Sequence, residues 1–230
     1  MLKIARRVGM ATPMAASKVA PAGLARTEHY GFAMSVDLEA SLPTPIPLAA
    51  VMTTARGTLA ELLGVDTTPE LSVIVDRRYE QGRRMTVGRQ LGEAELLSAT
   101  IGHPIDPDPD GSPGSIHYEI DISGSNDGLW LMVIDHEPEA GGEVEAVFSP
   151  YRTCVSVVVA TAMALAVADL AGGEFIDEQI QMLRPGHTDP RHVVTATRLP
   201  PGQDGFATGC ERYLRQFPHL DGWPRDVSMP

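Results

Sequence analysis

The feature that most constrains the fold is a run of sixteen consecutive uncharged residues, Thr153–Ala168, bounded by Arg152 and Asp169. A helix needs about 20 apolar residues to span a bilayer, so this run is too short to cross a membrane. Because it is apolar on all sides, it is typical of a helix buried in a protein core. We therefore expect a buried helix over 151–170, ended by the glycine pair at 172–173. The residues expected at its centre are Val158, Ala162, Leu165 and Val167.

The segments around this run show the periodicities of both strands and helices. Strands are predicted at residues 30–38, 71–75, 83–91, 116–122, 129–134, 143–148, 175–183 and 192–199. Helices are predicted at 48–63, 93–99 and 209–217, and Gly64 should end the first of them. Residues 129–134 are apolar at every position, so this strand should be central and covered on both faces. This order predicts an α+β domain with a mainly antiparallel sheet, two principal helices and a split βαβ, ferredoxin-like first half.

The two ends of the chain differ in composition from its middle. Residues 1–27 hold five basic residues and no acidic one, and polar residues interrupt every apolar stretch, which disfavours a secretory signal. We interpret them as a flexible basic leader, residues 28–183 as the α+β domain and 184–230 as a Pro/Gly-rich C-terminal extension. The two cysteines, Cys154 and Cys210, do not suggest a disulfide framework, and a cytoplasmic location is expected.

The charge is distributed very unevenly. From Gln90 to Tyr151 there is no Lys or Arg but there are 13 carboxylates, whereas the rest of the chain holds 18 bases and 17 acids. The formal net charge of −12 therefore arises in this segment. Like charges repel one another and destabilise the fold, so their concentration favours a role in meeting a positive partner, such as a basic protein. The candidate partner-binding residues are Asp106, Asp108, Asp110, Glu119, Asp121, Glu137 and Glu139.

Two patterns raise the alternative of a metal site. Residues 106–111 resemble the start of a calcium loop, but its closing position, normally a bidentate Glu, is His117. The second pattern places His187, Asp189 and His192 within six residues, a donor set that suits zinc or iron. We expect Pro190 to prevent a helix from presenting them together. No second ligand cluster supports either site, and no cofactor is predicted.

Acidic residues on one predicted strand raise the alternative of acid–base chemistry. His117, Glu119 and Asp121 share one face of the strand at 116–122, because side chains alternate along a strand. Carboxylates from neighbouring strands could join them and raise one another's pKa values, which is how general acids arise. The candidates for this are Asp135, Glu143 and Glu145. No nucleophile motif accompanies them, since residues 124–128 predict a turn rather than a nucleophile elbow.

Five arginines surround one predicted hairpin, at positions 77, 78, 83, 84 and 89. A nucleic-acid site would combine such a patch with exposed aromatic residues, and Tyr79 is the only aromatic residue there. Because the net charge of the chain also opposes polyanions, nucleic acid is not expected as a partner. These arginines should instead be solvated or paired with the acidic half of the protein.

Residues 152–177 show the pattern of a helix, a Gly-Gly cap and a Phe-Ile-Asp strand. This segment resembles the closing unit of small acidic α/β immunity proteins of bacterial polymorphic-toxin systems. The resemblance implies a cytoplasmic, non-enzymatic inhibitor that meets a toxin through an acidic surface, and it carries over no binding residues. Two classes of function therefore remain open. The first is a non-catalytic binder of a basic protein, and the second is a metal-assisted hydrolase that uses His, Asp and Glu clusters.

Overall fold

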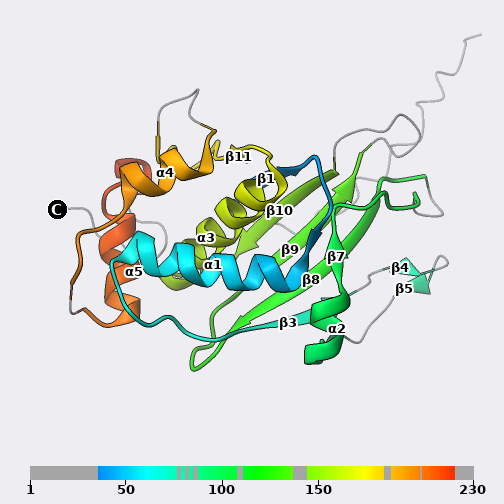
Figure 1. The fold of residues 1–230 in the computed structure, drawn as a ribbon, viewed down its shortest axis with the longest axis horizontal. Coiled ribbons are helices and arrows are strands. Elements are labelled where there is room, and N and C mark those ends of the chain that lie inside the picture. The colour runs from blue at the N-terminus through cyan, green and yellow to red at the C-terminus, as the bar shows by residue number, and fades with distance from the viewer. Residues whose placement is uncertain are drawn as a thin grey trace, which may run out of the picture. The chain divides into compact units, whose positions relative to one another are not determined.

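The computed structural model describes residues 36–76, 79–80, 83–84, 88–107, 111–136, 144–183, 188–202 and 204–220 (Figure 1). The strands are β1 Leu38–Leu42, β2 Ile46–Pro47, β3 Leu71–Asp76, β4 Tyr79–Glu80, β5 Arg83–Arg84, β6 Arg89–Gln90, β7 Thr100–Ile101, β8 Gly114–Ile122, β9 Gly128–Asp135, β10 Val144–Pro150 and β11 Phe175–Ile176. The helices are α1 Leu48–Leu63, α2 Glu93–Ser98, α3 Cys154–Ala171, α4 Pro190–Thr197 and α5 Phe206–Leu214, followed by a 3₁₀ turn at Pro218–Leu220.

Seven of the strands form one sheet, in the order β11-β1-β10-β9-β8-β3-β6. Every neighbouring pair in this sheet is antiparallel. With α1 and α3 as the principal helices, this confirms the predicted α+β class and the mainly antiparallel sheet. Two further pairs, β2 with β7 and β4 with β5, lie outside the main sheet.

Three helical crossovers join parallel strands that are not neighbours, as in a split βαβ unit. Helix α3 leads from β10 to β11, and β1 lies in the gap between them. Helix α1 leads from β1 to β3, and here β10, β9 and β8 fill the gap. Helix α2 leads from β6 to β8, and β3 lies in the gap between these two strands. The strand order therefore differs from the ferredoxin-like arrangement predicted for the first half, because β10, β9 and β8 lie between β1 and β3 and β6 lies at the edge of the sheet.

Helix α3 is the buried helix that the sequence predicts. The Thr153 hydroxyl oxygen caps its first turn by accepting a hydrogen bond from the Ser156 N–H at 3.1 Å. Gly172 ends it in the left-handed conformation, with φ 67°. The four residues predicted at its centre are at most 1% exposed, which confirms the core prediction. Among the described helices, α3 alone has the length and composition of a membrane span, and 83% of it is buried inside the protein.

Helix α1 also follows the predicted periodicity and packs against α3. Its apolar residues recur three and four positions apart, so they form one buried stripe. Gly64 ends the helix with φ 63°, and its N–H donates to the last carbonyl groups of the helix. The buried residues of α1 are Leu48, Val51, Met52, Ala55, Leu59, Leu62 and Leu63.

The predicted strand at 192–199 is wrong, because α4 occupies this position. Asp189 caps α4 by accepting a hydrogen bond from the Arg191 N–H at 3.0 Å, and Pro190 fits the first helical position, where no N–H is needed. Val193 and Thr197 are buried one helical turn apart. An Asp-Pro pair before this spacing is a helix start, and this signal was available in the sequence.

The C-terminal extension contributes to the core as well. Both α4 and α5 pack against α3. On α5, Cys210, Tyr213 and Leu214 are fully buried, and burial raises the pKa of the Cys210 thiol above its usual range. The Tyr213 hydroxyl lies 2.9 Å from the Thr197 hydroxyl, so a hydrogen bond joins α5 to α4. The segment after residue 184 therefore adds two helices to the same hydrophobic core.

Three other predicted strands differ from the structure in extent. Of the strand at 30–38, residues 30–35 lie outside the described residues, and β1 begins only at Leu38. The strand at 83–91 is divided, since 83–84 pair with β4 whereas 89–90 pair with β3. The strand at 175–183 ends at Ile176, because the Asp177 carboxylate accepts hydrogen bonds from the N–H groups of Ile180 and Met182, at 2.7 and 2.8 Å, and folds the chain into a turn.

Candidate partner-binding surface

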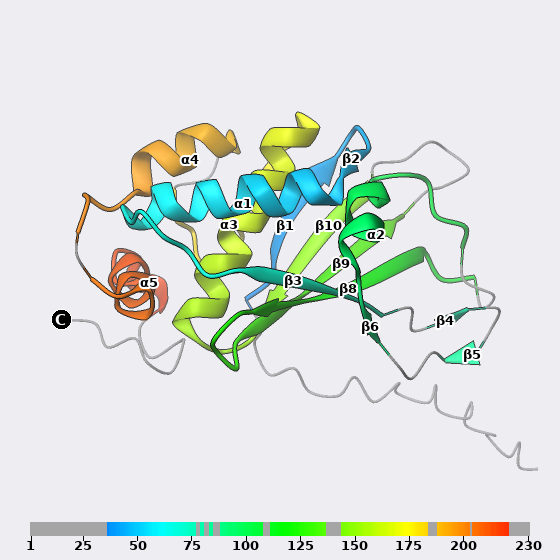
Figure 2. The same ribbon diagram turned by 60° about the horizontal axis from the view of Figure 1, so that its bottom comes forward.

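The sheet has one face covered by helices and one face that no described helix covers. Helices α1 and α3 lie on the same side of it (Figure 2), and α2, α4 and α5 pack against those helices. Burial alternates accordingly along β8, β9 and β10, since side chains toward the helices are buried and most side chains between them are half-buried. We call the side away from α1 and α3 the open face.

An apolar strip runs along the middle of the open face. Its residues are Trp130, Met132 and Ile134 on the central strand β9, and Val147 beside Met132 on β10. The sequence predicts that β9 is central and covered on both faces. The central position is confirmed, but on the second face these apolar side chains are only half-buried. The strip therefore has the composition of a covered surface, although no described helix covers it.

Carboxylates flank this strip on both sides. On β8, Glu119 lies directly beside Trp130, and Asp121 follows two residues later on the same face. On the other side, Glu145 of β10 lies beside Ile134, and Glu39 of β1 lies beside Val147. We call these two pairs the acidic rims. Among the described strand residues on the open face there is no Lys or Arg.

The structure separates the residues predicted to bind the partner. Asp108, Asp110, Glu137 and Glu139 lie outside the described residues. Asp106 is exposed in the loop beside Gly114, at the start of β8, whereas Glu119 and Asp121 lie near its end. Gly114 and Asp121 are seven residues apart along the strand, which corresponds to roughly 23 Å. Of the predicted residues that the structure describes, only Glu119 and Asp121 are therefore brought together.

Tyr151 holds the Glu119 carboxylate in place. Its hydroxyl group donates a hydrogen bond to Glu119 Oε1 at 2.6 Å. Burial and then this hydrogen bond raise the pKa of the Tyr151 hydroxyl above its usual range, so the tyrosine remains a donor at neutral pH. Gly128 gives the Tyr151 ring room, because a Cβ atom there would lie 3.2 Å from it. This arrangement fixes one carboxylate next to Trp130.

The β8–β9 turn and its neighbours form a polar cavity of roughly 630 Å³ beside this rim. Asp121 and Tyr151 line it, together with Glu70 and Asp127. Two of these carboxylates already bind within the protein, since Glu70 pairs with Arg56 at 2.8 Å and Asp127 accepts a hydrogen bond from the Thr153 hydroxyl at 2.6 Å. Asp121 is exposed and thus presents its charge to a cationic group entering the cavity.

At the other rim, Glu39 and Glu145 interact with each other. Burial, followed by repulsion from Glu145 and a hydrogen bond shared with it, raises the pKa of Glu39 to about 7. Glu178 and Asp37 raise it further. Glu145 also lies 3.1 Å from His136 Nε2. Part of the negative charge of this rim is therefore titrated near neutral pH.

We expect Glu39→Gln to change stability differently at pH 5 and pH 8. Because the folded-state pKa of Glu39 is raised from 4.5 to about 7, its contribution to stability is present below about pH 4.5 and is lost as the pH rises through 7. Glutamine carries no charge at either pH, so the variant should gain stability relative to the wild type at pH 8. Urea unfolding of both proteins at the two pH values measures this, and an equal difference at both would contradict it.

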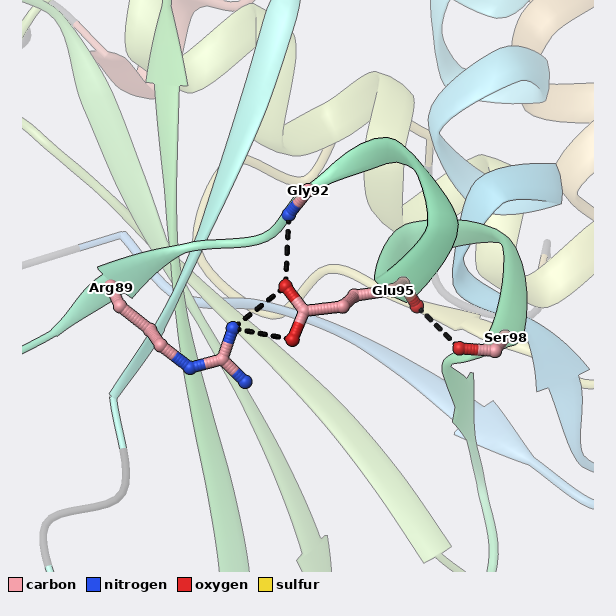
Figure 3. Close-up of polar contacts among 4 residues, drawn as sticks. All are labelled: Arg89, Gly92, Glu95 and Ser98. Atoms are coloured by element: carbon pink, nitrogen blue, oxygen red, sulfur yellow. Dashed lines mark hydrogen bonds and ion pairs between the residues drawn. The ribbon is translucent and has the colours of Figure 1, made fainter.

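The arginine-rich hairpin is described only in part. Arg77 and Arg78 lie outside the described residues, and so do the side chains of Arg83 and Arg84. Arg89 pairs with Glu95 of the acidic segment, with Nη1 at 2.7 Å from both carboxylate oxygens (Figure 3). The same carboxylate accepts a hydrogen bond from the Gly92 N–H at 3.0 Å, and these contacts lower the pKa of Glu95. The predicted pairing with the acidic half is confirmed for Arg89.

Among the described residues, the acid–base cluster considered as an alternative around β8 is not assembled. Asp135 is buried at 2% exposure and accepts a hydrogen bond from the Ile105 N–H at 3.1 Å. Glu145 lies on β10, so the apolar side chains of β9 separate it from Glu119. Glu143 lies outside the described residues. His117 does share its face with Glu119 and Asp121, as predicted, and its Nε2 lies 3.1 Å from the Ser115 hydroxyl.

Two of the three candidate metal ligands near the C-terminus lie among the described residues. Asp189 caps α4, His192 is exposed on that helix, and His187 lies outside the described residues. Pro190 begins a helix here rather than preventing one, which corrects our interpretation of this motif. In the calcium-like loop, residues 108–110 are outside the described part, and His117 belongs to β8. Within the described residues, no group of three or more His, Cys, Asp or Glu side chains is placed to hold a metal ion.

Comparison with protein-family models, with curated proteins and with solved structures finds no match to this chain. We therefore infer the candidate surface from the geometry of this chain alone. Sequence reasoning placed Glu119 and Asp121 among the partner-binding residues and named Glu145 only for the acid–base alternative. It missed Glu39 and the apolar strip. The available signal was Trp130, a large aromatic residue on the non-core side of an apolar strand with acidic strands on either side.

Proposed function

We propose that this protein is a non-catalytic cytoplasmic binding protein that docks a basic protein partner through its acidic surface. An immunity-type inhibitor of a toxin is the specific form that this function would take. The observation that supports the proposal is the open face, where the rim carboxylates Glu39, Glu119, Asp121 and Glu145 meet no Lys or Arg among the described strand residues.

The placement of these charges is informative because folding does not require it. Carboxylates that share a face repel one another, and after burial, repulsion from Glu145 is the next cause that raises the pKa of Glu39 to about 7. A cationic partner would relieve that repulsion. Complementary potentials also increase association rates, which suits a protein that must capture its partner quickly.

Affinity capture from the source organism tests this function. Full-length protein used as bait at about 0.01 M ionic strength should retain a basic protein, and most of it should be lost near 0.1 M, because the Debye length falls from about 30 to about 10 Å. The Glu119→Gln/Asp121→Asn bait should retain less of it. The Asp66→Asn/Glu93→Gln bait, which loses the same charge at exposed positions off the open face, serves as the control. Recovery of acidic or neutral proteins alone would contradict the proposed function, and so would retention of a basic protein that does not change with ionic strength.

A further inference from the structure

The open face has the anatomy of a protein–protein interface. Such interfaces combine an apolar centre, enriched in aromatic residues and Met, with a polar rim. Here Trp130 and Met132 form the centre, together with Ile134 and Val147, and they are half-buried rather than exposed. The rims lie on both sides of this centre. Most binding energy in an interface comes from a few central residues, and Trp is enriched among them.

The dimensions of the surface indicate the shape of its occupant. Strands β8 and β10 lie two strand spacings apart, which corresponds to roughly 10 Å. This is about the diameter of an α-helix with its side chains. A helix lying along β9 would place one apolar stripe on Trp130, Met132 and Ile134. Residues flanking that stripe would then reach Glu119 on one side and Glu145 on the other.

Resting on the proposed function, we propose that the open face binds an amphipathic basic helix of the partner. The apolar stripe of this helix covers the strip centred on Trp130, and its Arg and Lys side chains pair with the rims formed by Glu119 and Asp121 and by Glu39 and Glu145. Charge complementarity selects a cationic occupant, because the described strand residues of this face carry carboxylates and no Lys or Arg. Among cationic occupants, the apolar strip favours one whose apolar residues lie in a single stripe along a helix.

A designed peptide pair tests this proposal on the full-length protein. The first peptide is an 18-residue helix of Leu, Ala and Arg, with its Leu residues on one face and its Arg residues flanking them. The second has the same composition in scrambled order, so that it keeps the charge but loses the stripe. Fluorescence anisotropy of each labelled peptide should show the first binding at least about 10-fold more tightly, since only it can bury its Leu residues on the strip.

Variants then locate the binding site. Trp130→Ala should weaken binding of the ordered peptide by about 30-fold, the size expected for a central interface residue. Leu97→Ala is the matched control, because Leu97 is 66% exposed on α2 and lies off the open face. Glu119→Gln and Glu145→Gln should each weaken binding and reduce its dependence on salt. These two variants still test the proposal if Trp130→Ala fails to fold, and circular dichroism would show such a failure.

Hydrogen exchange distinguishes the remaining outcomes. The ordered peptide should protect amides on β8, β9 and β10. Equal binding of both peptides, or protection elsewhere, would overturn the proposal even if affinity capture yields a basic partner, so the proposed function could stand without it. Self-association of the protein with protection on this same face would also overturn it, because the occupant would then be a second copy.

Discussion

Leu165→Ala is expected to lower the free energy of unfolding by about 2–5 kcal/mol, the range measured for truncation of buried leucines. Leu165 is 1% exposed, and every residue of α3 from Cys154 to Ala168 is buried. Removing its side chain leaves a void that close-packed surroundings fill only in part. Urea unfolding followed by circular dichroism measures the change directly.

Leu170→Ala is the matched control for this prediction. Leu170 belongs to the same helix but is 37% exposed, so the same truncation removes less buried surface and should cost clearly less. If the two variants unfolded at the same urea concentration, α3 would not be the centre of the core.

Gly173→Ala is expected to destabilise the fold by about 1–3 kcal/mol or more, because overpacking forces the surrounding backbone to move. A Cβ atom at this position would lie 2.1 Å from the Ser41 carbonyl oxygen and 2.9 Å from Pro43 Cδ. The contact joins the end of α3 to β1. There the Ser41 N–H donates to Glu174 O at 3.0 Å, and the Glu174 N–H donates to Ser41 Oγ at 2.8 Å.

Gly57→Ala is the control for this prediction, and we expect it to raise the free energy of unfolding in the same urea assay. Gly57 lies inside α1, and a Cβ atom there would meet no atom within 4 Å. Alanine is a better helix former than glycine by roughly 0.5–1 kcal/mol, so this variant should gain stability. A Gly173→Ala protein as stable as the wild type would show that β1 and the end of α3 do not approach as closely as described.

Much of the fold could be predicted from the sequence because local patterns set it. The stripe of α1, the uncharged run of α3 and their glycine caps each specify a helix without reference to the rest of the chain. Strand order is different, because it depends on which distant segments pair. The pairing of β1 with β10 joins residues more than a hundred positions apart, and no local pattern predicts it. The extent of β11 was predicted wrongly for a similar reason, because the turn at Asp177 depends on side-chain hydrogen bonds.

The candidate site could be predicted only in part for the same physical reason. Alternation places Glu119 and Asp121 on one face of a strand, and this prediction held. Their association with Trp130 and their separation from Asp106 depend on the register between strands. Glu39 lies outside the acidic segment altogether and reaches the surface only through the pairing of β1 with β10. The composition therefore indicated that the surface is negatively charged. The strand pairing of the sheet determines which carboxylates lie on it.

The central claim is that the acidic surface captures a basic partner, and stopped-flow measurement of the association rate tests it most directly. With the partner obtained by affinity capture, the rate should approach about 10⁸–10⁹ M⁻¹s⁻¹ at low salt and fall steeply as the ionic strength rises. Glu119→Gln/Asp121→Asn should slow association more than it speeds dissociation, whereas Asp66→Asn/Glu93→Gln should have a smaller effect. An association rate that does not change with salt, or that changes equally in both double variants, would contradict the account.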